Sequence, residues 1–468
     1  MISVRPITKE AYRLFHDGSL ALAEAEFNGI RCDRTYCERM IANVDRQVQS
    51  ITRQIGESEL GKAWARRYGH KTLYSSGQQL REVLTKELGL KISKETRKGN
   101  ISIDHKVLEE LGRDDLKLLL KKNGLEKMSG TYLKNFLAES EADGFIHPFF
   151  HLSEYGEEVR GGASTYRSSS SHPNFQNLPN RHEEERRLIR RAFLPRPGHR
   201  IVSRDYGGME FRVSACLHQD PNMIRYIEQG DDPHRDTASH CFALDPELCT
   251  KKYGEMGKLV RHAGKNSFTF AQMYFQDPAN TAKGLWSSID DLGLCHPGDP
   301  EKSMRDHLRD RKIHGYGDFE RHIEKVVRWF WGDMFPEYGR WRERWISDYE
   351  KKGYFDMITG FRLEGVMSKY QLGNYPIQGP AFHCLLWSMT RLHRRWSERG
   401  GVRSKIIGQI HDELTTDEHR EEFDRNQEEV PRIMEEEIRK EWPWIVVPLE
   451  VETEATGVDE SWYYKKGV

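Results

Sequence analysis

Two short apolar segments that each carry an aspartate most constrain how this chain can fold. In HRIVSRDYGG, Asp205 follows an apolar run and precedes Gly207-Gly208, and in KIIGQIHDELTTD, Asp412 separates two apolar runs. Short apolar runs bounded by turn residues predict strands, here one strand that leads into a helix and two strands that meet near His411-Asp412. Both carboxylates therefore lie where strands stop, which is where functional groups are commonly presented.

The two carboxylates come close together if these strands pair side by side. Like charges a few ångströms apart raise a pKa or demand a cation. Two magnesium ions would relieve that repulsion and form a phosphoryl-transfer site, because metals roughly 3.5 to 4 Å apart clamp the attacking and leaving oxygens. Hard oxygen ligands favour Mg²⁺ over zinc. Each aspartate taken alone is better explained as a surface turn residue.

Long helical segments surround these few strands, which predicts an α+β architecture. The spacing of apolar residues indicates one long amphipathic helix over 20–60 and further helices over about 222–275 and 316–350. The Gly-, Pro- and Asp-rich stretch near 276–315 is expected to be an irregular insertion, and the Ser- and Asn-rich segment 161–180 a loop. At about 150 residues per domain, the length suggests about three domains.

Composition excludes several classes of protein. No apolar run approaches the roughly 18 residues that span a bilayer, and the first residues lack the apolar core of a signal peptide. We therefore expect a cytoplasmic protein. The seven cysteines are scattered without zinc-like spacing, which indicates reduced thiols.

The formal net charge of −1 hides segments of the chain in which basic or acidic residues predominate. Segment 180–200 has seven arginines against three glutamates, whereas 417–441 has eleven acidic residues against five basic ones. An acidic back and a basic front would suit a protein that binds a polyanion. Solvated helix faces whose charges cancel explain the pattern about as well.

A further predicted helix, RHAGKNSFTFAQMYF, carries a second group of candidates. Arg261 and Lys265 are four residues apart and share one face, where they could bind a triphosphate. A phosphate-binding loop is excluded because Leu259 occupies its first Gly position and Asn266 replaces Ser/Thr. Four aromatic residues could stack on a base, although core packing explains them better unaided: Phe268, Phe270, Tyr274 and Phe275.

With these motifs in this order, the chain resembles family A DNA polymerases of the bacterial polymerase I and bacteriophage type over nearly its whole length. STYRSSSSHPNFQNLPN is similar to that family's Thr-Gly-Arg-Leu-Ser-Ser segment, IRYIEQGDDPHRDTASHCF to its Asp-x-His-x-x-Thr-Ala stretch, and NYPIQGPA to its Asn-x-Pro-x-Gln-Gly-x-Ala helix. The resemblance implies an α+β right-hand polymerase with a palm, helical fingers and a helical thumb. The implied ranges are a segment leading into the palm at 1–25, thumb 26–145, first palm part with motif A 146–220, fingers 221–360, and second palm part with motif C 361–468.

The resemblance also implies roles for individual residues. Asp205 and Asp412 would hold two Mg²⁺ ions, for which Mn²⁺ can substitute, with the backbone carbonyl of Tyr206 as a further ligand. Glu210 would be the steric gate that disfavours a ribose 2′-hydroxyl. The nucleotide would also contact His234, Arg261, Lys265, Phe270 and Tyr274, with Lys265 as the proton donor to pyrophosphate.

The implied primer-template contacts are Arg167 and Gln378, which would read the minor-groove face, and His411, which would position the primer terminus. Glu413 is a secondary carboxylate. Tyr166 departs from the family pattern, because it stands where a Gly usually precedes the arginine.

The nucleotide-binding helix departs from the family spacing. That spacing places an aromatic residue and a Tyr where Thr269 and Met273 stand. Phe270 and Tyr274 match only if one residue is inserted, for example as a π-bulge, a feature often found at functional sites. We adopt this register because FTFAQMY then lines up with the family's aromatic-Gly-x-x-Tyr run. Phe275 replaces the final Gly, which puts the hinge motion of this helix in question.

The function expected from this resemblance is template-directed DNA synthesis, in which a primer 3′-hydroxyl attacks a deoxynucleoside triphosphate and releases pyrophosphate. Primer-template DNA and dNTPs would be the partners of a monomer without membrane contact. No stretch upstream of the thumb accommodates a 3′–5′ exonuclease, so we expect no proofreading, with a separately encoded exonuclease or other replisome proteins as further partners, as in a bacteriophage or mobile-element replicase.

Two alternatives remain. A single-subunit RNA polymerase is disfavoured by Glu210 and by the His411-Asp412-Glu413 turn. A non-catalytic DNA-binding replisome protein is disfavoured by the intact aspartate pair.

Overall fold

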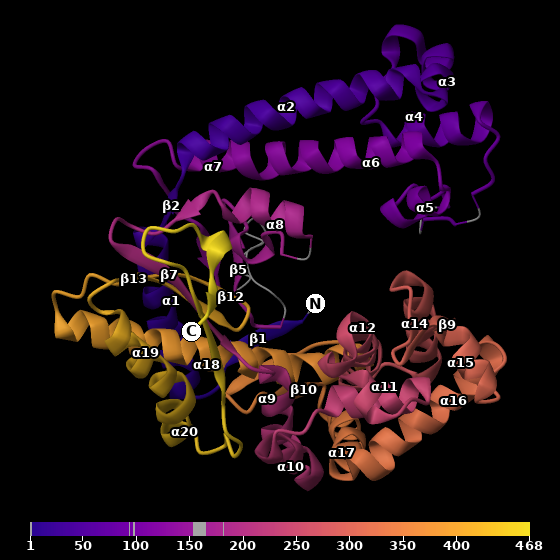
Figure 1. Cartoon of the computed structure of the whole chain (residues 1–468). Coiled ribbons are helices and arrows are strands. Elements are labelled where there is room, and N and C mark those ends of the chain that lie inside the picture. The colour runs from indigo at the N-terminus through magenta and orange to yellow at the C-terminus, as the bar shows by residue number, and fades with distance from the viewer. Residues whose placement is uncertain (1, 93, 97–98, 153–164, 181) are drawn as a thin grey trace.

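The computed structural model describes residues 2–92, 94–96, 99–152, 165–180 and 182–468. Figure 1 shows three parts, which we call the sheet body, the helical arm that extends above it, and the helical lobe at the lower right. Helices and antiparallel sheets are combined in one chain. The α+β class predicted from the sequence is therefore confirmed.

The sheet body is built on a five-stranded antiparallel sheet. Its strands, in spatial order, are β12 (Lys405–Ile410), β13 (Glu413–His419), β7 (His199–Tyr206), β14 (Val451–Ala455) and β15 (Lys466–Gly467). Helix α18 (Lys369–Arg399) packs against α1 (Lys9–Asn28), α9 (Met209–His218) and β13, and α1 also packs against β12. The central strand β7 has four consecutive buried residues, 201–204, because neighbours surround it. It continues to Tyr206, beyond the apolar run that predicts it.

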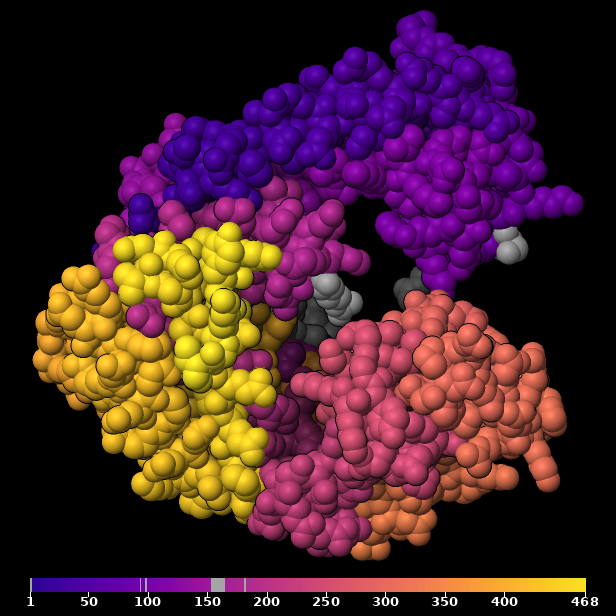
Figure 2. All heavy atoms as spheres, viewed as in Figure 1, coloured from indigo at the N-terminus to yellow at the C-terminus, as the bar shows by residue number. Residues whose placement is uncertain are grey.

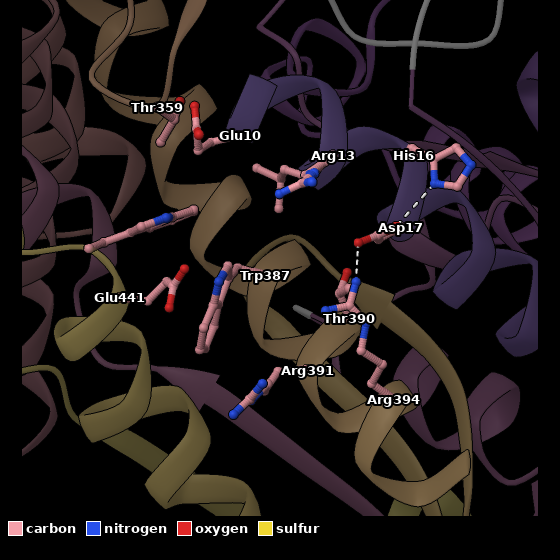
Figure 3. Close-up of a pocket in the computed structure, with 12 residues that line it drawn as sticks. Glu10, Arg13, His16, Asp17, Thr359, Trp387, Thr390, Arg391, Arg394 and Glu441 are labelled. Carbon is pink, nitrogen blue, oxygen red and sulfur yellow. Dashed lines mark hydrogen bonds and ion pairs between the residues drawn. The ribbon is translucent and has the colours of Figure 1, made fainter. Parts of the chain in front are cut away.

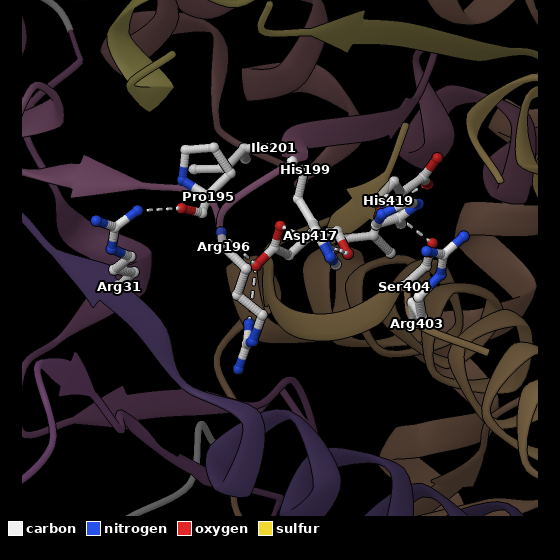
Figure 4. Close-up of polar contacts among 12 residues, drawn as sticks. Arg31, Pro195, Arg196, His199, Ile201, Arg403, Ser404, Asp417 and His419 are labelled. Atoms are coloured by element: carbon white, nitrogen blue, oxygen red, sulfur yellow. Dashed lines mark hydrogen bonds and ion pairs between the residues drawn. The ribbon is translucent and has the colours of Figure 1, made fainter. Parts of the chain in front are cut away.

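Buried charges on β13 hold its register against β7. The Arg204 guanidinium donates to Glu418 at 2.5 Å, and both side chains are fully buried. Asp417 accepts from the side chain of Arg196 at 2.8 Å and lies 3.3 Å from Nδ1 of His199 (Figure 4). A buried charge without its partner is costly, so these pairs disfavour any slip of β13 along β7.

Smaller elements complete the sheet body. They are β1 (Ser3–Pro6), β10 (Tyr354–Asp356) and β11 (Phe361–Glu364) in one sheet, β2 (Ile30–Cys32), β3 (Phe145–Ile146) and β6 (Phe193–Leu194) in another, the pair β4 (Phe149–His151) and β5 (Ser169–Ser171), and helices α8 (Glu183–Arg190), α19 (Phe423–Arg432) and α20 (Ile438–Glu441). The loop predicted over 161–180 contains β5, and its first residues lie outside the described residues.

The acidic segment 417–441 is largely neutralised within the body. Arg399 of α18 donates to Glu429 at 2.9 Å, and Arg395 donates to Glu437 at 2.8 Å. These ion pairs neutralise acidic side chains of the segment 417–441. They favour the interpretation in which its charges cancel over the interpretation in which it forms an acidic surface.

The arm has its own hydrophobic core around the buried Trp64 and Leu116. Its helices are α2 (Arg34–Glu57), α3 (Glu59–Tyr68), α4 (Gly77–Glu82), α5 (His105–Glu110), α6 (Asp114–Lys127) and α7 (Lys134–Glu139), with π turns at Val83–Glu87 and Met128–Leu133. The single helix predicted over 20–60 is wrong, because the chain breaks at Gly29 (φ +59°) and Asp33 caps α2. A Cβ at Gly29 would lie 2.9 Å from the carbonyl of Ile146, so packing imposes this break.

The lobe is helical throughout except for one hairpin. It contains α10 (Pro221–Gln229), α11 (Pro233–Phe242), α12 (Gly254–Gly264), α13 (Phe270–Met273), α14 (Pro278–Asp291), β8 (Cys295–His296), β9 (Asp299–Ser303), α15 (Met304–Asp310), α16 (Tyr316–Trp329) and α17 (Pro336–Lys352), with π turns at Lys265–Thr269 and Phe330–Met334. The irregular insertion predicted near 276–315 is wrong. Asp277 and Ser303 cap helices there, and Met304 and Leu308 are fully buried, so long-range packing orders a segment whose composition resembles a loop.

Among the described residues, one ion pair joins the arm to the lobe. Lys106 of α5 pairs with Asp291 at the end of α14, and a second bond from Ser287 orients that carboxylate at 2.9 Å. Figure 2 shows the hollow that body, arm and lobe surround. The contact therefore lies on the side of the hollow opposite the sheet.

Candidate active site

The two predicted carboxylates lie at one edge of the five-stranded sheet, where its strands end: Asp205 lies near the end of β7, and Asp412 lies in the turn that leads into the neighbouring strand β13. Strand pairing places Glu413 directly opposite Asp205, and the two-residue turn His411-Asp412 joins β12 to β13. The backbone N–H of Tyr206 donates to the Asp412 carbonyl at 3.4 Å. His411 adopts φ +59°, as a tight two-residue hairpin turn requires. The hairpin thus fixes Asp412 beside the strand that carries Asp205.

Electrostatic crowding at this edge perturbs both aspartates. Loss of hydration, followed by repulsion from Asp412 and Glu413, raises the pKa of Asp205 to about 7. Loss of hydration also raises the pKa of Asp412, although the nearby Arg167 opposes the shift. Repulsion of this kind is relieved by protonation or by a bound cation.

The donor atoms at this edge fit a hard divalent cation. They are carboxylate oxygens, which Mg²⁺ and Mn²⁺ prefer. Among the described residues no group of three or more His, Cys, Asp or Glu side chains is arranged to hold a metal ion. Cations here would therefore be held by Asp205 and Asp412 together with backbone, solvent or substrate oxygens. The backbone of Tyr206 is well fixed for this, because its buried hydroxyl bonds Ser388 and the Met434 carbonyl, each at 2.9 Å.

Four further candidates form one hydrogen-bonded group beside the aspartates. Arg167 donates to Glu210 at 2.5 Å, and the Tyr274 hydroxyl donates to the other oxygen of the same carboxylate. Gln378 of α18 donates to the Tyr274 hydroxyl at 3.4 Å. Burial and the adjacent Glu210 raise the pKa of Tyr274 far above its ordinary value, so this phenol stays protonated and donates. Residues from three parts of the sequence thus meet at Glu210.

The lobe holds the remaining nucleotide candidates as a second cluster. Arg261 donates two bonds to Asp232, one of them at 3.0 Å, and Asp232 also caps α11 beside His234. Burial, reinforced by the nearby lysine and arginine, lowers the pKa of His234 to about 3. Lys265 lies 5.5 Å from the centre of the Phe270 ring. His234 is therefore neutral at pH 7, and the positive charge of this cluster comes from Arg261 and Lys265.

The π turn that the aromatic register requires is present. It spans Lys265–Thr269 and adds one residue to the helix. Thr269 and Met273 are consequently buried in the core. Phe270 and Tyr274 instead stack on each other, with ring centres 6.0 Å apart and planes 15° apart. The register chosen from the sequence agrees with this geometry.

Two aromatic residues that replace glycines of the family pattern keep a glycine-like backbone. Phe275 has φ +58° and Tyr166 has φ +63°. Such angles are strained for residues with a Cβ, and both side chains are anchored in buried aromatic clusters. Phe275 lies beneath the guanidinium of Arg342 at 5.2 Å, and Tyr166 stacks on Phe15 at 4.6 Å. Packing of these two side chains thus holds the backbone at positive φ angles that glycine adopts without strain.

Sequence reasoning missed two residues of the site. Asp232, which holds Arg261, lies in the Asp-x-His motif and could have been found as a carboxylate near the predicted cations. Lys465 contacts Glu413 at 3.2 Å. No local pattern predicts that contact, because it depends on how β15 pairs with the sheet.

A separate hollow of about 620 Å³ lies on the body between α1 and α18. Figure 3 shows Arg13, Trp387 and the Arg394–Asp17 ion pair in its wall. None of the candidate residues lines it, so the candidate site is distinct from this hollow.

Comparison with known proteins adds independent evidence. The model of the family described as DNA polymerase family A matches residues 35–285 and 319–463. The chain is 27% identical over 442 residues to the DNA polymerase I of Chloroflexus aurantiacus, covering 92% of this chain and 41% of that protein. It is 28% identical over 464 residues to the thermostable DNA polymerase I of Thermus thermophilus (96% and 47%), and 28% identical over 468 residues to the DNA polymerase I of Lactococcus lactis (98% and 47%).

A solved structure shares the fold. The POL domain of Pol1 from M. smegmatis, in complex with DNA primer-template and dNTP, aligns with a TM-score of 0.72 at 24% identity, over 97% of this chain and 70% of that chain. The chain spans less than half the length of the curated relatives it matches. Within the part of the chain that the structure describes, every helix is too short or too polar to span a lipid bilayer.

Proposed function

The chain belongs to DNA polymerase family A, and from this membership we propose that it extends a primer on a DNA template by adding deoxynucleotides. The single observation that carries the proposal is the placement of Asp205 on β7 beside Asp412 in the turn that leads into the paired strand β13, where their crowded carboxylates suit divalent cations. We assign the sheet body as the palm, the arm as the thumb and the lobe as the fingers. The hollow they surround would then hold primer-template DNA (Figure 2).

Asp205 and Asp412, with the Tyr206 carbonyl, would hold two Mg²⁺ or Mn²⁺ ions. When bound, these ions supply the positive charge that lowers the pKa of the primer hydroxyl and stabilises the developing charge on phosphate. Asp412 is half-buried, and partial exclusion of water strengthens such interactions. The protein thereby contributes position and charge, and no covalent intermediate is needed.

The lobe cluster would bind the triphosphate. Arg261 and Lys265 would offset its negative charge, which requires Arg261 to exchange Asp232 for phosphate oxygens. Lys265 would donate a proton to the departing pyrophosphate. His234, which is neutral at pH 7, would contribute a hydrogen bond without a charge. The stacked Phe270 and Tyr274 would lie against the incoming base.

The palm residues would select the sugar and position the primer. Glu210 is held by Arg167 and Tyr274, and a carboxylate fixed in this way would exclude a 2′-hydroxyl. His411 lines a hollow of about 420 Å³ together with Tyr132 at the base of the arm. We assign this hollow to the primer strand near its terminus.

Primer extension with each dNTP in the presence of Mg²⁺ tests the proposal. Asp205→Asn and Asp412→Asn should each reduce extension by at least about a thousandfold, because each removes a charged cation ligand, while binding of primer-template DNA persists. Asp299→Asn, an exposed change in the β8–β9 hairpin, serves as the matched control. Robust extension by either site variant refutes the assignment. Incorporation of NTPs in preference to dNTPs would instead favour an RNA polymerase.

A further inference from the structure

Lys465 is brought to the candidate site by a segment that returns to the sheet edge. Trp462 is buried and stacks on Phe175 at 5.2 Å, with the guanidinium of Arg190 lying 4.5 Å from its ring. Four residues later β15 begins and pairs with β14, with Lys466 opposite Ala455. The Lys465 backbone is thus fixed on both sides by the indole anchor and the strand pairing.

The Lys465 side chain is engaged with carboxylates. Its Nζ lies 3.2 Å from Glu413 Oε2 and 2.9 Å from Glu454 Oε2, and the lysine side chain is only 13% exposed. The other oxygen of Glu413 accepts from the Thr415 hydroxyl at 3.2 Å. Both oxygens of Glu413 are therefore bound within the protein.

The ion pair of Lys465 matters for the site because several acidic side chains surround Asp205. Asp205 is flanked across β13 by Glu413 and across β14 by Glu452, with Asp412 on the adjoining turn. Three acids thus repel its charge, and Lys465 is the cation that most opposes them among the described residues. Without Lys465, the Glu413 carboxylate would lie beside Asp205 without its ion-pair partner, and a cation bound there would attract it.

We propose that Lys465 is a positioning residue that holds Glu413 away from the catalytic cations, so that Asp205 and Asp412 remain their side-chain ligands. This inference rests on the proposed function. A carboxylate that joins the cations adds a negative charge and a competing ligand. It would tighten cation binding but move the cations away from the positions that phosphoryl transfer needs.

The test compares Lys465→Met with Lys465→Arg, using Lys466→Met as the matched control because Lys466 is an exposed neighbour. Mn²⁺ binding to each protein without DNA is measured by electron paramagnetic resonance, and single-nucleotide extension is measured across Mg²⁺ concentrations. Lys465→Met should bind Mn²⁺ about tenfold more tightly, because Glu413, freed from its ion pair, adds a carboxylate ligand for the cation. The same variant should extend more slowly at saturating Mg²⁺. Lys465→Arg and Lys466→Met should match the unmodified protein on both measures.

A double variant tests whether Lys465 affects cation binding through Glu413. If Lys465 acts through Glu413, the pair Glu413→Gln and Lys465→Met together should behave like Glu413→Gln alone. A purely structural lysine would lower the melting temperature without tightening Mn²⁺ binding, and that result overturns the inference. Asp205→Asn separates the two failures. If it abolishes extension while Lys465→Met leaves Mn²⁺ affinity unchanged, only the role of Lys465 is wrong; if it extends normally, the proposed function is wrong.

Discussion

The buried pair between Arg204 and Glu418 gives a quantitative prediction about the strand that carries Asp205. Both side chains are fully buried, and Arg204 also donates to the carbonyl of Asn426 at 3.2 Å. Arg204→Met leaves Glu418 as an uncompensated buried charge, which costs about 3 to 5 kcal/mol. Unfolding entropy of about 2.1 cal/mol/K per residue amounts to about 1 kcal/mol/K over 468 residues. If the chain unfolds as one unit, the melting temperature should therefore fall by about 3 to 5 °C.

Differential scanning calorimetry measures this shift. The double variant Arg204→Met with Glu418→Leu should recover most of the loss, because replacing both members of a buried pair with apolar residues is often neutral. Arg321→Met, which removes a solvent-exposed pair with Asp318, should move the melting temperature by less than about 1 °C. A single Arg204→Met variant that melts within 1 °C of the unmodified protein, or a double variant that melts lower still, refutes the reasoning.

Two further predictions concern the cations and the contact between arm and lobe. Because the pKa of Asp205 is raised to about 7, protons compete with cations for this carboxylate below that pH. The affinity for Mn²⁺ should therefore fall about tenfold for each pH unit between pH 7 and pH 5. An affinity that stays constant over this range contradicts the raised pKa. Lys106→Glu or Asp291→Lys breaks the contact between arm and lobe and should speed dissociation of primer-template DNA by up to about fivefold, as expected for an exposed ion pair. The charge-swapped double variant should restore slow dissociation, and failure to do so means that the two residues do not act as a pair.

Local patterns in the sequence predict the parts of this fold that local chemistry determines. The apolar runs before Asp205 and around Asp412 correspond to β7, β12 and β13, and the aromatic residues shifted by one position in the segment 268–275 correspond to a π turn. The break at Gly29 was missed because helical apolar spacing continues on both sides of it. Glycine is required there by the positive φ of +59° and by the close approach of Ile146 and His147, more than a hundred residues away.

The features that could not be predicted from the sequence depend on contacts between residues far apart in the chain. Segment 276–315 has the composition of a loop, yet burial of Met304 and Leu308 orders it. The contact between Lys465 and Glu413 likewise depends on the edge pairing of β15. In both cases the decisive neighbour is distant in sequence and leaves no periodic signal.

The contact between Lys106 and Asp291 also has a topological consequence. Body, arm and lobe then surround the hollow on all sides, so under the proposed function a nucleic acid without free ends would enter only when this junction parts, whereas a strand with a free end could thread through. Capture and threading would then be distinct routes of loading. Ionic strength that screens the junction would favour capture relative to threading.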